Sequence, residues 1–481
     1  MNNNIWKFQT FQKLWTFRQK NAKKMNKIFI VISLAICISS CKTSNSLYSK
    51  YTPIDTVSEN LYGEDSSVKQ LASNSNLADI SWRTFFSDSI LLGYIEKGIT
   101  STSDVEKAKM QIREMEINLS AAKKAFLPSL TLSPQGQITR FDGVTSKVYD
   151  VPLVAQWQAD IFGSMRNKKE QAKVYAAQAQ DMLQAVQCQI VSDIASIYYK
   201  LLMLDNEMEV LKATEALRIK SVETQKALMN AGMSTSAGVS RMEASLYDVQ
   251  VQILDIEQAI ADNELALCFV LDEDPHAIKR GKLSDFRMPE IVGTGLPVEI
   301  LKNRPDVRSA QRTVEVAYYG MLQSKADLYP SLNLQATVGW TNGGGVVNPG
   351  KVLWDALAGL TAPIFAKGQL TAAYRIAQIE QDIAKEKFLD AVTMAGNEVN
   401  SALTNCSIAK RKMPILSRQV EALSSAYEAT KELMNHGNIT YLEVLTSQEA
   451  LLNAQLNEII NKEAGIQAVI SLYIALGGVN H

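Results

Sequence analysis

Cysteine and histidine are scarce in this 481-residue chain, which has five cysteines and three histidines. Beyond the N-terminal region the cysteines are an odd number scattered among helical patterns, which disfavours a disulfide framework and predicts buried free thiols. They are Cys188, Cys268 and Cys406. No two histidines share a helix face at the spacing of metal ligands, so neither a metal centre nor a resident cofactor is expected; they are His276, His436 and His481.

The chain also lacks an excess of charge of either sign, with a formal net charge of -1. No stripe of Lys and Arg with interleaved aromatic residues is present, which argues against nucleic acid as a partner. The glycine clusters at 293–295 and 343–345 lack the lysine and the strand–loop–helix context of a phosphate-binding loop, and we interpret them as turns. The sequence therefore offers no catalytic site, and we do not expect an enzyme.

Residues 1–40 have the pattern of a signal peptide. They contain seven basic and no acidic residues, and the apolar run at 28–38 is too short to span a bilayer as a helix. Met25-Asn26-Lys27 is itself an ordinary signal-peptide start, so translation from Met25 is an alternative. Without residues 1–40 the chain keeps 42 basic and 50 acidic residues, a net charge near -8.

The signal peptide ends at Ile38-Ser39-Ser40-Cys41, which resembles a bacterial lipobox. This resemblance implies cleavage before Cys41 and acylation of its sulfur and of the new amino group. A fortuitous cysteine after a signal peptide is the alternative.

Two halves of the chain repeat each other in register. Leu228-Met229-Asn230-Ala231-Gly232 recurs 205 positions later as Leu433-Met434-Asn435-His436-Gly437. Phe126-Leu127-Pro128-Ser129-Leu130 recurs 202 positions later as Leu328-Tyr329-Pro330-Ser331-Leu332. The unit is far longer than a solenoid repeat, so the pattern predicts a duplicated large structural unit and favours a pseudo-symmetric ring or tube.

Helix breakers are nearly absent from two long segments, at 166–231 and 369–436. The first has a coiled-coil seam of apolar residues at steps of three and four, and at 1.5 Å per residue it would reach about 100 Å. The second contains Pro414, so we expect a bend or break near Met413. A glycine ends each segment, and return helices at 239–271 and 441–476 complete two helical hairpins.

Polar and apolar residues alternate at 129–133 and 331–338, which is typical of strands with one face in an apolar medium. Partner strands are expected at 149–162 and 352–365, after turns that contain Asp142-Gly143 and 343–345. Three tryptophans, Trp157, Trp340 and Trp354, suit the aromatic girdle of a membrane barrel. A soluble sandwich edge is the alternative. Four strands cannot close a barrel, so several chains would have to contribute strands.

These features together resemble the TolC-like outer membrane efflux proteins, the outer membrane factor lipoproteins (NodT-type) of RND-type tripartite pumps. The resemblance covers nearly the whole chain after the signal peptide. Its most distinctive motif is Arg304-Pro305-Asp306-Val307, accompanied by the strand-entry prolines Pro128 and Pro330 and by Asp160-Ile161-Phe162-Gly163. Pro305 and Asp306 also suit the first turn of a helix.

The resemblance implies a mixed α and β membrane protein of long helical coiled-coil hairpins with four transmembrane strands per chain. A homotrimer would form a 12-stranded β-barrel continuous with a periplasmic α-barrel, in the bacterial outer membrane. We divide the chain into a signal peptide (1–40), a lipidated equatorial segment (41–102), a first repeat (103–271), a connector (272–303), a second repeat (304–476) and a tail (477–481).

The resemblance also implies passive transport, with a periplasmic adaptor docked on the hairpin tips and an inner-membrane pump supplying energy. The tip residues are Gly232, Ser234, Gly437 and Tyr441, although turn geometry alone would also explain the glycines. The periplasmic gate would lie at Leu442, Thr446 and Glu449. We expect an apolar ring from Leu442 and an acidic, cation-favouring ring from Glu449. A Glu449 that is solvated or paired with a neighbouring lysine is the alternative.

Two other functions compete with a small-molecule efflux duct. A type I protein-secretion channel would share the architecture, and the lipobox and Arg304-Pro305-Asp306 lean toward efflux. A lipid-anchored periplasmic coiled-coil adaptor or tether would share the helices and lipid, but it would not need duplicated strands bearing aromatic residues. The sequence does not specify the cargo.

Overall fold

The structure of the protein is a computed structural model that describes residue 47 and residues 49–54, 81–282, 304–343, 350–436, 439 and 441–478. The signal peptide, Cys41, Gly437 and connector residues 283–303 lie outside these residues. Two compact units are present. The first comprises the described residues of Met1–Pro53, Glu116–Tyr175 and Thr313–Ala384, and the second those of Ile54–Met115, Ala176–Arg312 and Lys385–His481.

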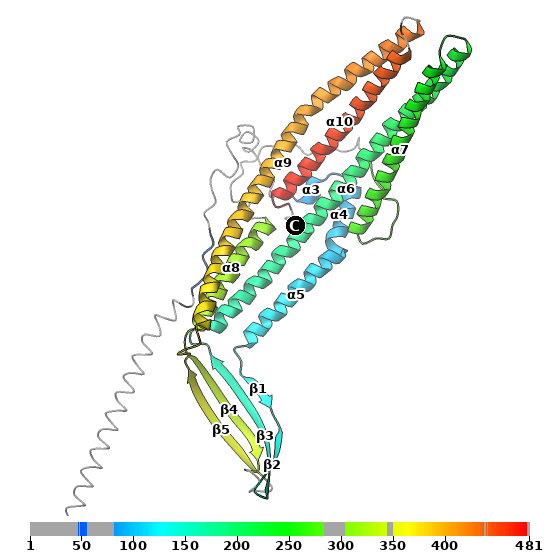
Figure 1. The fold of residues 1–481 in the computed structure, drawn as a ribbon. Coiled ribbons are helices and arrows are strands. Elements are labelled where there is room, and N and C mark those ends of the chain that lie inside the picture. Colours follow the sequence, from blue (N-terminus) through cyan, green and yellow to red (C-terminus); the bar gives the residue numbers. More distant parts are fainter. Residues whose placement is uncertain are drawn as a thin grey trace, which may run out of the picture. The chain divides into compact units, whose positions relative to one another are not determined.

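Helices dominate the described chain (Figure 1). They are α3 (Trp82–Phe85), α4 (Ser89–Ser101), α5 (Ser103–Lys124), α6 (Ser164–Asn230), α7 (Ser236–Val270), α8 (Pro305–Ala326), α9 (Gln369–Asn435) and α10 (Tyr441–Ala475). Among the described residues, no helix is both long and apolar enough to cross a membrane.

The predicted long helices are confirmed as α6 and α9, which have 67 residues each. Helix α6 ends as expected at Gly232, whose φ of 75° lets the Met233 N–H reach the Leu228 carbonyl oxygen at 2.8 Å. The Thr235 hydroxyl then accepts the Gly238 N–H and caps α7. Helix α9 runs through Pro414 as one helix, so the break that was expected near Met413 does not occur.

Three helices share the apolar core near the tip end of the second unit. Met208 and Leu211 of α6 pack with Val249 and Ile253 of α7 and with Leu452 of α10. Nearer the tip, Val222, Met242 and Leu445 form a further cluster from the same three helices. Most of the predicted α6 seam is buried: Leu211 belongs to the first cluster, and the others are Ile190, Ile194, Leu201 and Leu204, whereas Val186 and Ile197 are half-buried. The core therefore joins the first hairpin to the second repeat.

Arg304 joins the start of α8 to two other helices of the second unit. Its guanidinium donates to both carboxylate oxygens of Asp306, at 3.0 and 2.7 Å, and to Glu398 of α9 at 2.6 Å. Nη1 also donates to the Ala475 carbonyl oxygen, 3.0 Å away at the end of α10. Burial lowers the pKa of Arg304, but the hydrogen bonds and charges of Asp306 and Glu398 outweigh it and raise that pKa overall. The motif is thus a helix-joining ion cluster.

The first unit contains the β-sheet, with strands β1 (Ser129–Leu132), β2 (Gln135–Phe141), β3 (Val144–Ala159), β4 (Ser331–Thr341) and β5 (Lys351–Thr361). The structure thus has five strands where four were expected. Strands β1 and β2 pair with β3 in one continuous antiparallel register. Between them lie Ser133 and Pro134, and proline cannot donate to the ladder. Strand β2 lies beyond the expected segment at 129–133 and was not predicted.

Gly339 of β4 lies where the backbone of β3 leaves no room for a side chain. A Cβ built on Gly339 would lie 2.8 Å from the Cα of Pro152 and 2.9 Å from the Val151 carbonyl oxygen. Both are backbone atoms, so neither can rotate away. A Cβ built on Gly359 of β5 would have the Asn333 carbonyl oxygen as its nearest neighbour, at 4.0 Å.

We therefore predict that Gly339→Ala destabilises the sheet and that Gly359→Ala, the matched control, does not. Forcing β3 and β4 apart should cost about 1–3 kcal/mol, against less than about 0.5 kcal/mol for the control. Urea midpoints of the detergent-solubilised protein would measure both. Equal midpoints for the two variants would show that the close approach is not a constraint.

Arg304→Ala should destabilise the second unit by about 1–2 kcal/mol, because it removes charge-assisted hydrogen bonds to three groups. Arg83→Ala, which removes the exposed Arg83–Glu96 ion pair, should cost less than about 0.5 kcal/mol. Thermal unfolding would compare them, and an Arg83 effect as large as the Arg304 effect would contradict a helix-joining role.

The pH dependence of stability gives a second test of the ion pair between Arg304 and Asp306. Burial raises the pKa of Asp306, yet Arg304 outweighs it and lowers that pKa overall. The contribution of Asp306 is therefore complete above its unfolded pKa of about 3.9 and is lost as the pH falls through its lower folded pKa. Arg304→Ala should remove this acid dependence.

Candidate functional site

The sheet separates its side chains into one apolar and one polar face. Directly paired residues of antiparallel strands share a face, and successive residues alternate between faces. Leu153 of β3 pairs with Leu132 of β1 and with Val338 of β4, which pairs with Trp354 of β5. The same face carries Leu130, Val151, Ala155, Trp157, Ala159, Leu332, Leu334, Ala336, Trp340, Val352, Ala356, Ala358 and Leu360. Most of its large side chains are exposed in the single chain.

The opposite face carries most of the polar residues. Gln156 pairs with Gln335, Gln158 with Asn333, and Asp150 with Thr341. Strand β5 adds Lys351 and Asp355 to this face. Such a sheet can separate lipid from water: its apolar face suits hydrocarbon and its polar face suits an aqueous passage.

Tryptophans lie near both ends of the apolar face. Trp157 is near the end where β3 leads into α6, and its Nε1–H donates to the Phe126 carbonyl oxygen at 2.9 Å. Trp340 of β4 pairs with Val151 at the other end. Trp354 of β5 is two residues from Val352, which is the residue of β5 that pairs with Trp340. Amphipathic rings at both borders are typical of a membrane-spanning band.

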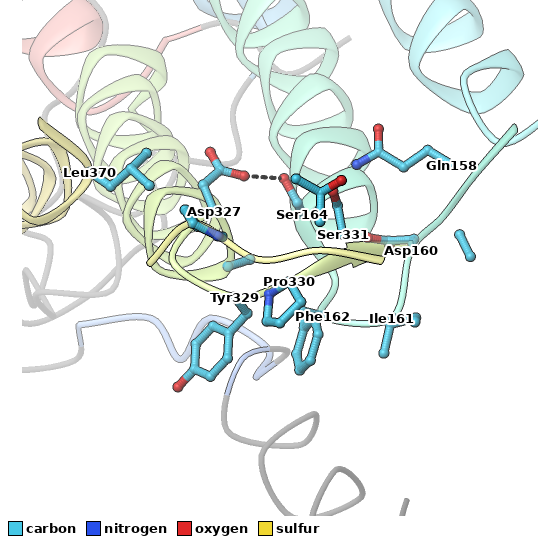
Figure 2. A pocket seen from close by; sticks show the side chains of 14 residues that line it. Gln158, Asp160, Ile161, Phe162, Ser164, Asp327, Tyr329, Pro330, Ser331 and Leu370 are labelled. Atoms are coloured by element: carbon cyan, nitrogen blue, oxygen red, sulfur yellow. Dashed lines mark hydrogen bonds between the residues drawn. The ribbon is translucent and has the colours of Figure 1, made fainter. Parts of the chain in front are cut away.

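The helical end of the sheet holds the second copy of the proline motif beside a hollow of about 350 Å³ (Figure 2). Phe162 stacks on Tyr329 with ring centroids 5.0 Å apart, and Ser164 donates to Asp327 at 2.9 Å. Asp160 accepts the N–H groups of Met165 and Arg166 and so caps α6. Pro330 lines the hollow, and Pro128 precedes β1. The motif residues thus form the strand-to-helix junctions.

The hairpin tips of the second unit meet at a pocket of about 620 Å³. Ser234 of the first tip and Tyr441 and Leu442 of the second all line it. Gly232 ends α6 outside this lining, and Gly437 lies outside the described residues. Gln225 donates to the Ser234 hydroxyl at 2.5 Å. The structure thereby brings three of the predicted tip and gate residues into one pocket.

The predicted gate residues share one face of α10. Leu442, Thr446 and Glu449 are spaced by four and three residues, and all three are exposed in the single chain. Thr446 directs its hydroxyl to the Leu442 carbonyl oxygen within the helix. This face is available to line a passage.

A buried arginine that no sequence pattern indicated lies next to the predicted gate residues. Arg218 of α6 has a side chain only 1% exposed, and its Nη2 is 3.9 Å from a carboxylate oxygen of the half-exposed Glu449. Its Nε and Nη1 have no hydrogen-bond partner within the described chain. Burial lowers the pKa of Arg218, and Glu449 acts in the opposite sense. Glu449 therefore has a partner, which is an arginine and not the lysine considered above.

The three described cysteines are free and buried, as expected. Burial raises the pKa of Cys188 and of Cys406 to about 12, so both thiols are protonated at neutral pH. Among the described residues, no group of three or more His, Cys, Asp or Glu is placed to hold a metal ion.

Known proteins match nearly the whole of this arrangement. The family model described as outer membrane efflux protein matches residues 95–272 and 296–478. The solvent efflux pump outer membrane protein SrpC of Pseudomonas putida is 23% identical over 410 residues, covering 82% of this chain and 87% of SrpC. Nodulation protein T of Rhizobium leguminosarum bv. trifolii is 24% identical over 422 residues, 85% of this chain and 90% of the relative.

A solved structure supports the fold. The open-state MtrE outer membrane channel of Neisseria gonorrhoeae superposes with a TM-score of 0.78 at 21% identity, covering 90% of this chain and 97% of MtrE. The resemblance inferred from the sequence is confirmed. The chain belongs to the outer membrane efflux protein family, whose members are channels of the bacterial outer membrane with a large periplasmic extension.

Proposed function

We propose that this protein is the outer-membrane exit duct of a tripartite efflux pump and passively conducts small toxic molecules or ions. The observation that carries the proposal is the division of the sheet into an apolar face and a polar face. The two faces extend over the ten residue pairs that join β3 to β4, and a strand of about 9–11 residues is long enough to cross a bilayer.

The duct is a homotrimer in this proposal. Strands β1 and β2 pair with β3 in one register and together occupy a single strand position of the sheet. Each chain therefore supplies four strand positions and leaves two free edges, at β1–β2 and at β5. Unpaired backbone groups at those edges would be costly in hydrocarbon. Three copies would close twelve strand positions into one β-barrel, with the long helices forming the periplasmic α-barrel.

Acylated Cys41 would add a second membrane attachment close to the sheet. Leu47, six residues later, is buried in the first unit, and its carbonyl oxygen accepts from Asn167 near the start of α6 at 3.1 Å. Tyr51 packs against Tyr318 of α8. Six residues span at most about 20 Å, so Cys41 would remain within reach of the membrane border.

The periplasmic adaptor would dock at the hairpin tips, in the pocket lined by Ser234 and Tyr441. Gly232 and Gly437 would shape the two turns, and an inner-membrane pump of the RND type would supply the energy and the selection of cargo. The exposed face with Leu442, Thr446 and Glu449 would line the constriction nearby.

Glu449 forms an acidic ring in this proposal, with its charge partly offset by Arg218. The guanidinium is buried in a medium of low dielectric constant, where its field reaches the carboxylate with little screening. The gate would therefore be a weaker cation filter than three isolated carboxylates.

Two alternative functions, a periplasmic tether and a protein-secretion duct, have less support. A periplasmic tether leaves the apolar sheet face without a role. A type I protein-secretion duct would share this architecture, but SrpC is named as a solvent efflux pump component and supports the small-molecule branch.

The channel prediction is direct: the full-length protein should run as a heat-resistant trimer in detergent and open ion-conducting channels in planar bilayers. Deleting the gene should sensitise the cell to part of a panel of antibiotics, bile salts, dyes, solvents and metal ions. Trimers and channels with an unaltered panel would separate a secretion duct from drug efflux. A monomer released by lipase would support the tether.

The gate prediction concerns ion selectivity. Glu449→Lys should abolish or reverse the cation preference of single channels, while Arg218→Met should strengthen it, because the carboxylate loses its counter-charge. Lys212→Gln, an exposed change on α6, is the control and should leave selectivity unaltered. Unchanged selectivity in both Glu449→Lys and Arg218→Met would overturn the charged-gate proposal.

A further inference from the structure

The apolar face of the sheet continues onto the β2–β3 hairpin, and there it becomes basic. Arg140 of β2 and Lys147 of β3 are the only charged residues on this face of the described strands. Arg140 pairs with Thr145 and Lys147 pairs with Ile138, which places the two basic residues diagonally across the ladder. Diagonal neighbours lie about 7–8 Å apart, so both side chains can reach one anionic group.

The hairpin holds these residues on a braced backbone. Beyond the end of β4, Asn342 continues the pairing with its side chain: Oδ1 accepts the Tyr149 N–H at 3.0 Å and Nδ2 donates to the Lys147 carbonyl oxygen at 2.8 Å. The Tyr149 hydroxyl in turn accepts the Gly350 N–H at 2.9 Å. The backbone of β3 at Lys147 is therefore braced by Asn342, which follows β4, and Arg140 is held beside it by the pairing of β2 with β3.

The pair lies just outside the membrane-spanning band. All the strand connections to α5, α6, α8 and α9 are at the opposite end of the sheet, so the β2–β3 turn is at the end remote from the periplasmic helices (Figure 1). Lys147 is four residues beyond Val151, the partner of Trp340, which is about 13 Å along the strand. With the usual strand tilt this corresponds to the headgroup layer of the outer leaflet.

The charges of Arg140 and Lys147 are not neutralised within the described chain. Neither forms an ion pair, and both side chains are exposed. The nearest acidic residues on the ladder do not share their face: Asp150 belongs to the polar face and Asp142 is in the turn, where its φ is 47°. A positive pair at headgroup level, next to an apolar face and to the ring of Tyr149, is complementary to a phosphorylated lipid.

We propose that Arg140 and Lys147 bind a phosphate group of an outer-leaflet glycolipid, with the lipid chains lying against the apolar row of β2 and β3. Arginine supplies a planar fork for two phosphate oxygens, and lysine supplies a point charge beside it. The inference rests on the proposed function, because it requires the sheet to span the outer membrane.

The test uses the full-length protein in mild detergent, with lipid A as the probe and native mass spectrometry or a binding titration as the readout. Arg140→Gln/Lys147→Gln should weaken lipid A binding by about thirtyfold, as expected for two basic side chains near a lipid phosphate. Arg140→Lys/Lys147→Arg keeps both charges and should retain most of the affinity. Lys351→Gln, which removes a positive charge from the polar face of the same sheet, should bind as the wild type does.

Dephosphorylated lipid A tests whether the phosphate or the acyl chains provide the affinity. Its affinity for the wild type should be as low as the affinity of lipid A for the Gln/Gln variant. Inorganic phosphate distinguishes a lipid site from a free-anion site, and full competition at millimolar concentration would overturn the proposal. Equal lipid A binding by the wild type and the Gln/Gln variant, or an equal loss in Lys351→Gln, would also overturn it. Channel conductance in zwitterionic bilayers reports on the duct separately and should persist in every variant.

Discussion

The antiparallel register of β3 against β4 is the constraint on which the membrane part of this protein depends. Because side chains alternate along a strand, a slip of one residue would turn Leu153 and Val338 toward the side of Gln156 and Gln335. The close approach at Gly339 fixes that register, since a side chain there would collide with the backbone at Pro152. The basic pair on the β2–β3 hairpin depends on the same alternation, which places Arg140 and Lys147 on the apolar face of the sheet.

The helical part follows a different logic, in which two similar hairpins have different chemistry. After the first tip, Gly238 leaves room for Gln225, which bonds to Ser234, and this tip is closed by its own polar contacts. After the second tip, Leu442, Thr446 and Glu449 expose their side chains. Arg218 couples the two copies, because it belongs to the first hairpin and faces an acid of the second. A duplicated scaffold can therefore contain a gate in only one of its copies.

Burial governs the electrostatics of the two ion clusters. Arg304 is almost enclosed and is satisfied by two carboxylates and a carbonyl group, so its charge is stable. Arg218 is enclosed more completely, yet within the described chain Glu449 is the one carboxylate at ion-pair distance from it. Moving or neutralising Glu449 would leave a buried guanidinium without compensation, which is costly in a low-dielectric interior. The proposed gate would thus be sensitive to the position of one side chain.

The sequence by itself determined the local structure. The scarcity of helix breakers predicted α6 and α9 to within about two residues, and the glycine after Asn230 predicted the end of α6. The alternating residues predicted β1 and β4 and their partners β3 and β5, but not β2, and the motif around Arg304 indicated the family. These features are readable because backbone conformation follows from residues close together in the chain.

Only the tertiary structure decided which elements lie opposite one another. The alternation at 129–133 did not reveal that β2, beyond Pro134, continues the pairing with β3 in the register of β1. The apolar stripe of α6 was evident, but periodicity does not reveal that Arg218 faces Glu449, more than 200 residues away. A pattern along one helix shows which face is buried, whereas the partner on the other side is selected by packing across the whole fold.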